Sequence, residues 1–210
     1  MILKKNEIKI ATILPYKESY TVEKASAVSL WISEFFSKSK FKNKNFIYGN
    51  ASSKNYLSKN YINIPLKNLK SKFKSTSKEY IIKISKKIIK EKFDIVEIHN
   101  RPLVLFELLK RINSKFIMYY HNDPLTMSGS KLVSERKEIL KKVDKLIFIS
   151  KWVEKRFFEN MDNTLKDKTE IIYHSTHKRK KKIKTNQIVF VGKLNHSKGY
   201  DIYKNAIIRI

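Results

Sequence analysis

Residues near the carboxyl terminus have the types and spacing that bind a diphosphate. An apolar run at 187–191 leads into Gly192 and Lys193, and a Lys198–Gly199 pair follows where a helix is expected to begin. A glycine lets the backbone approach a ligand closely, the first N–H groups of a helix are free, and cations neutralise phosphate. The pattern predicts a diphosphate site at Gly192, Lys193 and Lys198; a basic turn before a helix is the alternative.

Two histidines in the middle of the chain each end an apolar run. His99 ends the run 94–99 and His121 ends the run 115–121. Ligands of open α/β sheets bind at the carboxyl ends of the strands, so both histidines are candidate site residues. The alternative for each is a histidine whose hydrogen bonds are satisfied within the protein. The polar residues that follow are Asn100 and Arg101 in the first case, and Asn122 and Asp123 in the second.

Strand-like and helix-like segments alternate along the chain and would position these residues. Short apolar runs lie at 8–14, 45–48, 61–64, 94–99, 115–121, 145–150 and 170–174, and apolar residues at helical spacing lie at 22–38, 77–92, 102–112, 131–142 and 152–160. Continuous apolar strands separated by helices are typical of parallel βαβ units that are covered on both faces. The sequence therefore predicts an α/β fold with a doubly wound, Rossmann-like parallel sheet.

The alternating pattern breaks at Ser175. Residues 175–186 are rich in His, Lys and Arg and read as a solvated basic linker. A strand at 187–191 and a helix from Tyr200 are expected next, but one strand and part of a helix cannot bury their own apolar faces. We therefore expect a Rossmann-like domain at 1–174, a linker at 175–186, and the first βα unit of an incomplete second domain at 187–210.

The charge of the chain limits its classes of partner. The formal charge is +27, and only six residues are arginine. Arginine is the better residue for bidentate phosphate and base contacts, so its scarcity argues against a specific nucleic-acid reader. Lysines near an anionic membrane contribute about 1 kcal/mol each, which favours peripheral contact with anionic lipid. The chain has no cysteine, so disulfides and thiolate metal sites are excluded, and its apolar runs are too short to span a membrane.

The segment Phe190–Asp201, FVGKLNHSKGYD, resembles a family signature. It is similar to F-V-G-R-L-x-x-x-K-G, which opens the second domain of the family-4 glycosyltransferases of the two-domain GT-B fold. In that family the Arg and Lys grip the diphosphate of a nucleotide-sugar, which the resemblance assigns here to Lys193 and Lys198. Lys193 stands where the family usually has arginine, which costs bidentate geometry.

The resemblance extends over nearly the whole chain. Residues 94–102 resemble the family strand that ends in an inward histidine, and 119–124 resemble the next strand, with its His-Asn or His-Asp pair. The resemblance implies that His121 is catalytic and contacts the transferred sugar. Residues 144–153 resemble a segment in which a serine, here Ser150, caps the following helix. The acceptor side would include His99, Asn100, Arg101, Asn122 and Asp123.

Two segments depart from the family pattern. The loop after the first strand lacks the Gly-Gly pair of many relatives; Glu18 and Lys24 in this loop are candidate acceptor contacts, and a solvated loop is the alternative. Residues 171–177 stand where the family has V-I-x-N-G-V-D, but the Asn, Gly and Asp are all replaced. Any function of that segment is therefore open.

The resemblance implies a bacterial, retaining glycosyltransferase. It would use a nucleotide-sugar as co-substrate, a glycan or lipid-linked acceptor and no catalytic metal, and would build cell-surface polysaccharide or lipopolysaccharide at the cytoplasmic face of the inner membrane. The acidic pair E-x-x-x-x-x-x-x-E of the family does not occur in 199–210, so we expect the chain alone not to be an efficient catalyst. The alternatives are a basic module that binds nucleic acid or anionic membranes, and an inactive truncated remnant.

Overall fold

The computed structural model describes residues 8–66, 76–162, 166–174, 187–192 and 194–209. The chain divides into two compact units, residues 1–175 and 176–210, and each is described by itself.

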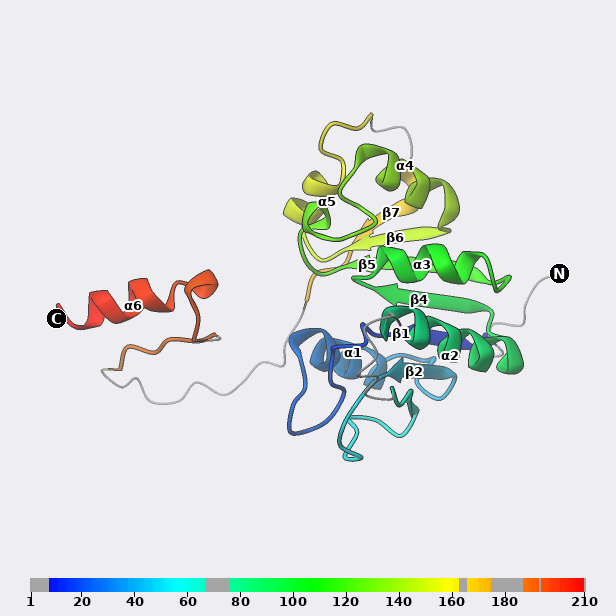
Figure 1. Ribbon diagram of the computed structural model, residues 1–210, viewed down its shortest axis with the longest axis horizontal. Helices are drawn as coiled ribbons and strands as arrows, with labels where there is room; N and C mark the ends of the chain where they lie inside the picture. Colours follow the sequence, from blue (N-terminus) through cyan, green and yellow to red (C-terminus); the bar gives the residue numbers. More distant parts are fainter. Residues whose placement is uncertain (1–7, 67–75, 163–165, 175–186, 193, 210) are drawn as a thin grey trace. The chain divides into compact units, whose positions relative to one another are not determined.

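The first unit is built on a seven-stranded parallel sheet (Figure 1). The strand order is β3-β2-β1-β4-β5-β6-β7, and every neighbouring pair of strands runs parallel. The strand order reverses between β1 and β4: from β1 the chain continues to β2 on one side, and from β4 it continues to β5 on the other. The predicted doubly wound α/β fold is confirmed. The strands are β1 Ile10–Ile13, β2 Asn45–Gly49, β3 Tyr61–Asn63, β4 Ile95–His99, β5 Lys115–Tyr120, β6 Lys145–Phe148 and β7 Thr169–Ile171.

In the described part of the first unit, five α-helices connect these strands, and two of them begin at a serine cap. The Ser150 hydroxyl accepts a hydrogen bond from the N–H of Val153 at 3.2 Å, which confirms the predicted cap. The Ser26 hydroxyl accepts from the N–H of Ser29 at 3.1 Å, so this helix begins later than the apolar spacing predicted. The helices are α1 Ala27–Ser37, α2 Thr76–Glu91, α3 Pro102–Leu109, α4 Val133–Lys142 and α5 Lys151–Phe157, with short 3-10 turns at η1 Pro124–Thr126 and η2 Lys166–Lys168.

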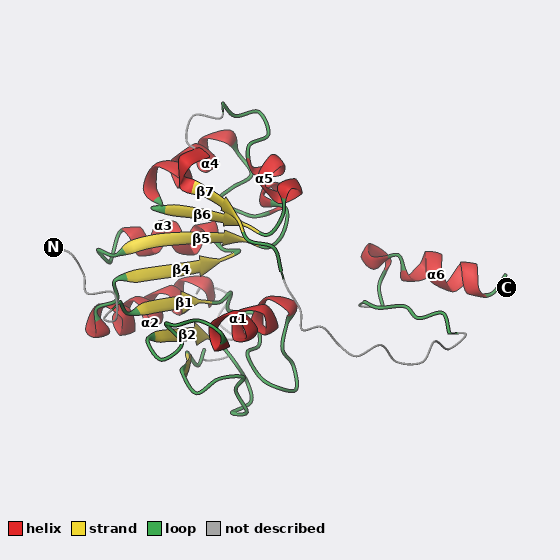
Figure 2. Ribbon diagram, turned by 180° about the vertical axis from the view of Figure 1, so that it is seen from behind, coloured by secondary structure: helices red, strands yellow, loops and turns green. Residues whose placement is uncertain are grey.

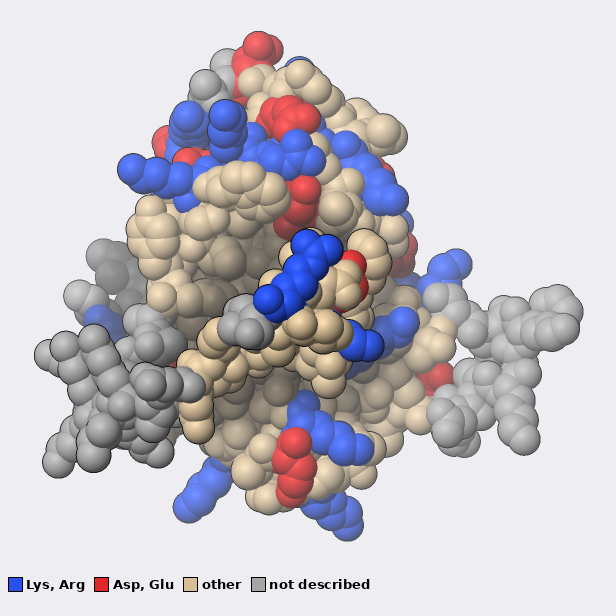
Figure 3. All heavy atoms as spheres, turned by 90° about the vertical axis from the view of Figure 1, so that its left-hand side faces the viewer, with Lys and Arg blue, Asp and Glu red and all other residues tan. Residues whose placement is uncertain are grey.

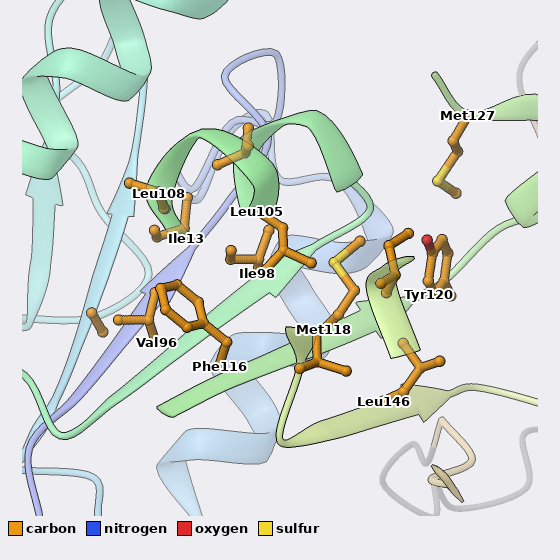
Figure 4. Close-up of a cluster of buried hydrophobic side chains, with 14 of the residues drawn as sticks. Ile13, Val96, Ile98, Leu105, Leu108, Phe116, Met118, Tyr120, Met127 and Leu146 are labelled. Atoms are coloured by element: carbon orange, nitrogen blue, oxygen red, sulfur yellow. The ribbon is translucent and has the colours of Figure 1, made fainter. Parts of the chain in front are cut away.

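One side of the sheet, the apolar face, packs against helices α2 to α5. Figure 4 shows Leu105 and Leu108 of α3 over side chains of β1, β4 and β5. Burial of such side chains removes apolar area from water and supplies most of the favourable free energy of folding. The strand residues on this face include Ile13, Val96, Ile98, Phe116, Met118, Tyr120, Leu146 and Phe148, all at most 3% exposed.

The α2 helix shows how narrow the buried stripe of a covering helix is. Ile84 and Ile88 are at most 1% exposed, whereas Ile82 and Ile89 are 43% and 52% exposed. Apolar residues at helical spacing in 77–92 therefore do not all lie on the buried stripe, and Ile82 and Ile89 lie outside it. They lie too far around the helix from the Ile84–Ile88 row to reach the sheet.

The opposite side of the sheet, the histidine face, is covered by α1, and Figure 2 shows the sheet from this side. Trp31, Ile32 and Phe36 of α1 pack with Ile47, Tyr119 and Ile147 of the strands. Between these apolar residues this face carries polar side chains, among them Thr12, Glu97 and His99, all at most 5% exposed. Buried polar groups need hydrogen-bond partners, so these side chains must contact one another or the backbone.

The second unit contains a 3-10 turn, η3 His196–Lys198, and the helix α6 Tyr200–Ile207. The predicted strand at 187–191 is wrong: these residues carry no strand pairing. A strand forms only where a neighbour completes its backbone hydrogen bonds, and the described residues of this unit offer none. The segment packs on α6 instead, with the Phe190 ring 5.4 Å from Tyr200 and 5.2 Å from Tyr203, and Tyr203 donating to the carbonyl of Ile188 at 3.2 Å.

Candidate functional site

The two predicted histidines meet at the carboxyl edge of the sheet. His99 is the last residue of β4 and lies opposite Tyr119 of β5, and His121 directly follows β5. The Nδ1 atom of His99 lies 2.8 Å from the Nε2 atom of His121, a hydrogen-bond distance. Two strand ends that are 22 residues apart in sequence therefore deliver one connected pair of imidazoles.

A third histidine extends this pair. The Nδ1 atom of His121 lies 3.0 Å from the Nε2 atom of His174, which follows β7. We call His99, His121 and His174 the histidine chain. Both ring nitrogens of His121 are thus engaged within the protein, and its side chain is only 5% exposed. Of the three histidines, His174 is the exposed one.

Sequence reasoning singled out His121 and left His174 without a role. The family comparison hid His174 because the segment 171–177 departs from the family pattern there. A simpler signal was present, since His174 ends the apolar run 170–174 just as His99 and His121 end theirs. Treating every strand end by the same rule would have found it.

The three imidazoles are held in their neutral form. Burial, followed by the neighbouring His121 and His174, holds the pKa of His99 well below its usual value. Burial and then His174 lower the pKa of His121 to about 3, and partial burial lowers the pKa of His174. A neutral imidazole has one donor and one acceptor nitrogen, so the two contacts must run in the same direction along the chain. A proton gained at His174 would make both of its ring nitrogens donors and so fix the direction of donation from His174 through His121 to His99.

Aromatic rings fix the orientation of these imidazoles. Trp31 of α1 stacks on His174 at 5.0 Å between ring centroids and meets His121 edge-on at 5.1 Å. Tyr119 stacks on His99 at 4.5 Å. Trp31 is only 7% exposed and lies between α1 and the strands, so it holds the histidine chain in place through these ring contacts. The Nε2 atom of His99 is buried and has no partner in the part of the chain that the structure describes.

A buried carboxyl lies behind the histidine chain. Oε2 of Glu97 lies 2.8 Å from the Thr12 hydroxyl, and Tyr119 also hydrogen-bonds this carboxyl. Burial raises the pKa of Glu97 to about 7, because an ionised carboxylate is poorly solvated inside the sheet. The Glu97 carboxyl, two residues before His99, therefore changes between its protonated and ionised forms near neutral pH.

Asn100 and Arg101 turn the chain at the end of β4. Asn100 has a φ of 54°, a left-handed conformation that asparagine tolerates better than most residues. Its Oδ1 atom accepts a hydrogen bond from the N–H of His121 at 2.7 Å, which ties the two strand ends together. Its carbonyl accepts from the Nη1 atom of Arg101 at 3.3 Å. Asn100 is thus a positioning residue for both the histidine chain and Arg101.

The residues after His121 differ in what they can reach. Asn122 is exposed. Asp123 is engaged within the protein: its Oδ2 atom accepts from Arg156 Nε at 3.2 Å and Nη2 at 3.1 Å, and its Oδ1 atom accepts from the N–H of Leu125 at 3.0 Å. These contacts lock the loop after β5 to α5.

Glu18 and Lys24 lie in the loop between β1 and α1, where Glu18 is half-buried and Lys24 is exposed.

A cavity of about 360 Å³ opens beside the exposed end of the histidine chain. It is lined by Trp31, Glu34, Phe35, Lys38, Ser39, Ile172 and Tyr173. Aromatic walls with a few polar groups are typical of small-molecule sites.

The predicted diphosphate residues lie in the second unit. Lys193 lies outside the described residues. A Cβ atom built on Gly192 would lie 3.9 Å from the Cβ of Lys198, so these two residues are neighbours. Gly199 has a φ of 70°, a conformation that favours glycine, and α6 begins directly after it.

No protein-family model matches the chain, and no curated protein matches it. In the part of the chain that the structure describes, no cluster of three or more His, Cys, Asp or Glu side chains is arranged to hold a metal ion. Among solved structures, a sucrose-phosphate synthase chain from Thermosynechococcus elongatus matches with a TM-score of 0.54 and 15% sequence identity. The match covers 80% of this chain and 90% of that chain. At this identity the likeness concerns the fold, and this chain therefore shares an α/β Rossmann-like fold with that enzyme.

Proposed function

We propose that this chain belongs to a nucleotide-sugar-dependent glycosyltransferase of the GT-B type, with the sheet domain on the acceptor side. The observation that carries the proposal is the meeting of His99, His121 and Asn100 at one strand edge, where the family resemblance expects its sugar-binding residues. The fold shared with a sucrose-phosphate synthase supports it, since that enzyme is named for a sugar phosphate that it makes. The family resemblance further implies retention of anomeric configuration.

The reaction would be a transfer of one glycosyl group. The acceptor oxygen bonds to the anomeric carbon while the bond from that carbon to the diphosphate breaks and its electron pair leaves with the diphosphate. The acceptor proton passes to the departing diphosphate. Lys193 and Lys198 neutralise this leaving group, and Gly192 lets it approach the backbone. His174 faces the substrate, and His121 orients His174 through the contact at 3.0 Å.

The cellular setting forms a finer part of the proposal: assembly of bacterial surface polysaccharide or lipopolysaccharide on a lipid-linked or glycan acceptor at the inner face of the cytoplasmic membrane. No helix among the described residues is long and apolar enough to cross a membrane. The charge of +27 favours peripheral contact with anionic lipid. In the upper part of Figure 3, which belongs to the first unit, Lys and Arg side chains stand among Asp and Glu side chains, whereas a nucleic-acid-binding surface commonly forms a continuous basic stripe.

The test is binding and transfer with a panel of nucleotide-sugars, followed by Lys198→Ala. Loss of this cation should weaken donor binding by about tenfold or more, since a charge-assisted phosphate contact is lost. Lys204→Ala is the matched control, because Lys204 is an exposed lysine on the helix that follows. Equal binding by wild type and Lys198→Ala, or binding of duplex DNA in preference to every nucleotide-sugar, would overturn the proposal.

A further inference from the structure

A second cavity, on the side of α2 and α3, opens at the point where the strand order reverses. It has a volume of about 290 Å³ and lies where the loops after β1 and β4 diverge. Crevices at such reversal points are the usual ligand sites of open α/β sheets. The polar residues that line it are Lys17 after β1, Asn100 and Arg101 after β4, Thr126 and Ser128 after β5, and Ser77 of α2.

The chemistry of this lining selects an anion. It holds two cations, Lys17 and Arg101, five hydroxyl groups, of which two belong to tyrosines, and no carboxylate. In the described part of the chain neither cation has a carboxylate partner, whereas Arg111 and Arg156 are paired with Glu107 and Asp123. A guanidinium group and an ammonium group that share a cavity with hydroxyl donors match the charge and geometry of a phosphate dianion.

The cavity is pre-organised by the residues around it. The guanidinium of Arg101 donates to the carbonyl of Asn100, whose side chain and backbone are both held by β5 and His121. Gly129, with a φ of 91°, lets the Ser128 loop approach the start of α3 closely. A Cβ atom at Gly129 would lie 3.1 Å from Pro102 Cβ and 3.2 Å from the backbone nitrogen of Leu103, so a larger residue would push this wall of the cavity away.

We propose that this cavity, which we call the anion pocket, binds a phosphate monoester group through Lys17 and Arg101. The phosphate would belong to the acceptor of the glycosyl transfer, an assignment that rests on the proposed function. The volume of about 290 Å³ accommodates a phosphate together with part of the group that carries it. That group is either a soluble sugar or a lipid, which share the phosphate chemistry. The donor diphosphate residues belong to the second unit and are not among the residues that line this pocket.

The experiment uses the full chain and three probes: inorganic phosphate, glucose 6-phosphate, and vesicles of phosphatidylcholine with or without phosphatidic acid. Binding is measured by titration calorimetry for the soluble probes and by co-sedimentation for the vesicles. Arg101→Gln and Lys17→Gln should each weaken phosphate binding by about tenfold or more, because each removes a charge-assisted contact. Lys59→Gln is the matched control: it removes the same charge from a lysine that lines a different cavity.

The outcomes separate the two sources and the two proposals. Arg101-dependent binding of glucose 6-phosphate identifies a soluble ester, and Arg101-dependent binding of phosphatidic acid vesicles alone identifies a lipid. Absence of saturable phosphate binding, or equal weakening by Arg101→Gln and Lys59→Gln, overturns the anion pocket. Thermal unfolding of each variant shows whether a loss comes from misfolding; a Lys17→Gln variant that melts like wild type and binds phosphate as tightly also overturns it. Nucleotide-sugar binding through Lys198 is measured separately, so either proposal can fail while the other stands.

Discussion

The two faces of the sheet solve different physical problems with the same strands. On the apolar face, residues such as Ile98, Met118 and Leu146 are fully buried under α2 to α5. On the histidine face, alternate residues of the same strands are polar: Glu97 and His99 stand between the apolar residues of β4. Successive side chains of a strand point to opposite faces, so one strand can serve both purposes.

Because side chains alternate between the two faces, one face of the sheet supplies most of the stability and the other carries the buried ionisable groups. The apolar face buries hydrocarbon without polar partners, which supplies free energy of folding. The histidine face buries imidazoles and a carboxyl, which costs free energy unless each group is hydrogen-bonded or neutral. The apolar face should therefore respond to changes of side-chain volume, and the histidine face to changes of pH.

The largest expected effect concerns the apolar face. Ile84→Ala should lower the free energy of unfolding by about 2–5 kcal/mol, because Ile84 is fully buried and its truncation leaves a cavity between α2 and the sheet. Ile82→Ala on the same helix is the matched control and should cost well under about 1 kcal/mol, since Ile82 is 43% exposed. Urea unfolding of both variants measures the difference. Equal losses would show that the two faces of α2 are not distinguished as described.

The next effect concerns the histidine chain and depends on pH. The folded pKa of His121 is about 3 and lies below the unfolded value near 6.5, so between these values the unfolded state binds more protons. Stability from this residue is therefore present above pH 6.5 and is lost as the pH falls toward 3. Between pH 7 and pH 4 the loss is on the order of 3 kcal/mol. His121→Gln removes it, so the variant should lose less stability on acidification.

Stability curves from pH 7 to pH 4 measure this effect, with Lys204→Gln as a control that leaves the histidine face intact. Parallel pH profiles of wild type and His121→Gln would contradict a neutral, buried histidine chain. A variant that is less stable at pH 7 yet flatter in its profile supports it, because removing His121 leaves His99 and His174 without their partner.

How much of this arrangement the sequence could predict depends on the range of the interaction. The strands, most helices and the Ser150 cap follow from local patterns, since an apolar run or a serine before a helix acts over a few residues. His99 and His121 were found because each ends its own strand. The engagement of both ring nitrogens of His121 depends on β4 and β7, which are distant in sequence, so no local pattern could show that His174 is the exposed member.

The same reasoning applies to two features outside the histidine chain. Asp123 was placed on the acceptor side, and its pairing with Arg156, 33 residues away, is visible only in the fold. The run 187–191 has the composition of a strand, but a strand also needs a neighbour, which sequence composition does not supply. In both cases a contact distant in sequence, present for Asp123 and absent for 187–191, decided the local structure.

A smaller and opposite pH effect is expected from Glu97. Its folded pKa of about 7 lies above the ordinary value of 4.5, so between these values the folded state binds more protons and stability falls as the pH rises. Between pH 5 and pH 7 the loss is about 2 kcal/mol. Glu97→Gln keeps an oxygen for the Thr12 hydroxyl and cannot ionise, so it should abolish this slope. A variant with the wild-type slope over this interval would show that the slope does not come from titration of Glu97.

The smallest effect concerns a cap whose contribution is local to one helix. Ser150→Ala removes the acceptor for the Val153 N–H and should lower the free energy of unfolding by about 1 kcal/mol. Because Val153 and Phe157 carry α5 onto the apolar face, this loss should appear equally at pH 5 and pH 7, in contrast to the Glu97 and His121 effects. Ser134→Ala, at an exposed serine in the first turn of α4, is the control and should change stability little. A pH-dependent loss in Ser150→Ala would mean that α5 also supports the histidine chain, and the separation of the two faces would then be incomplete at this helix.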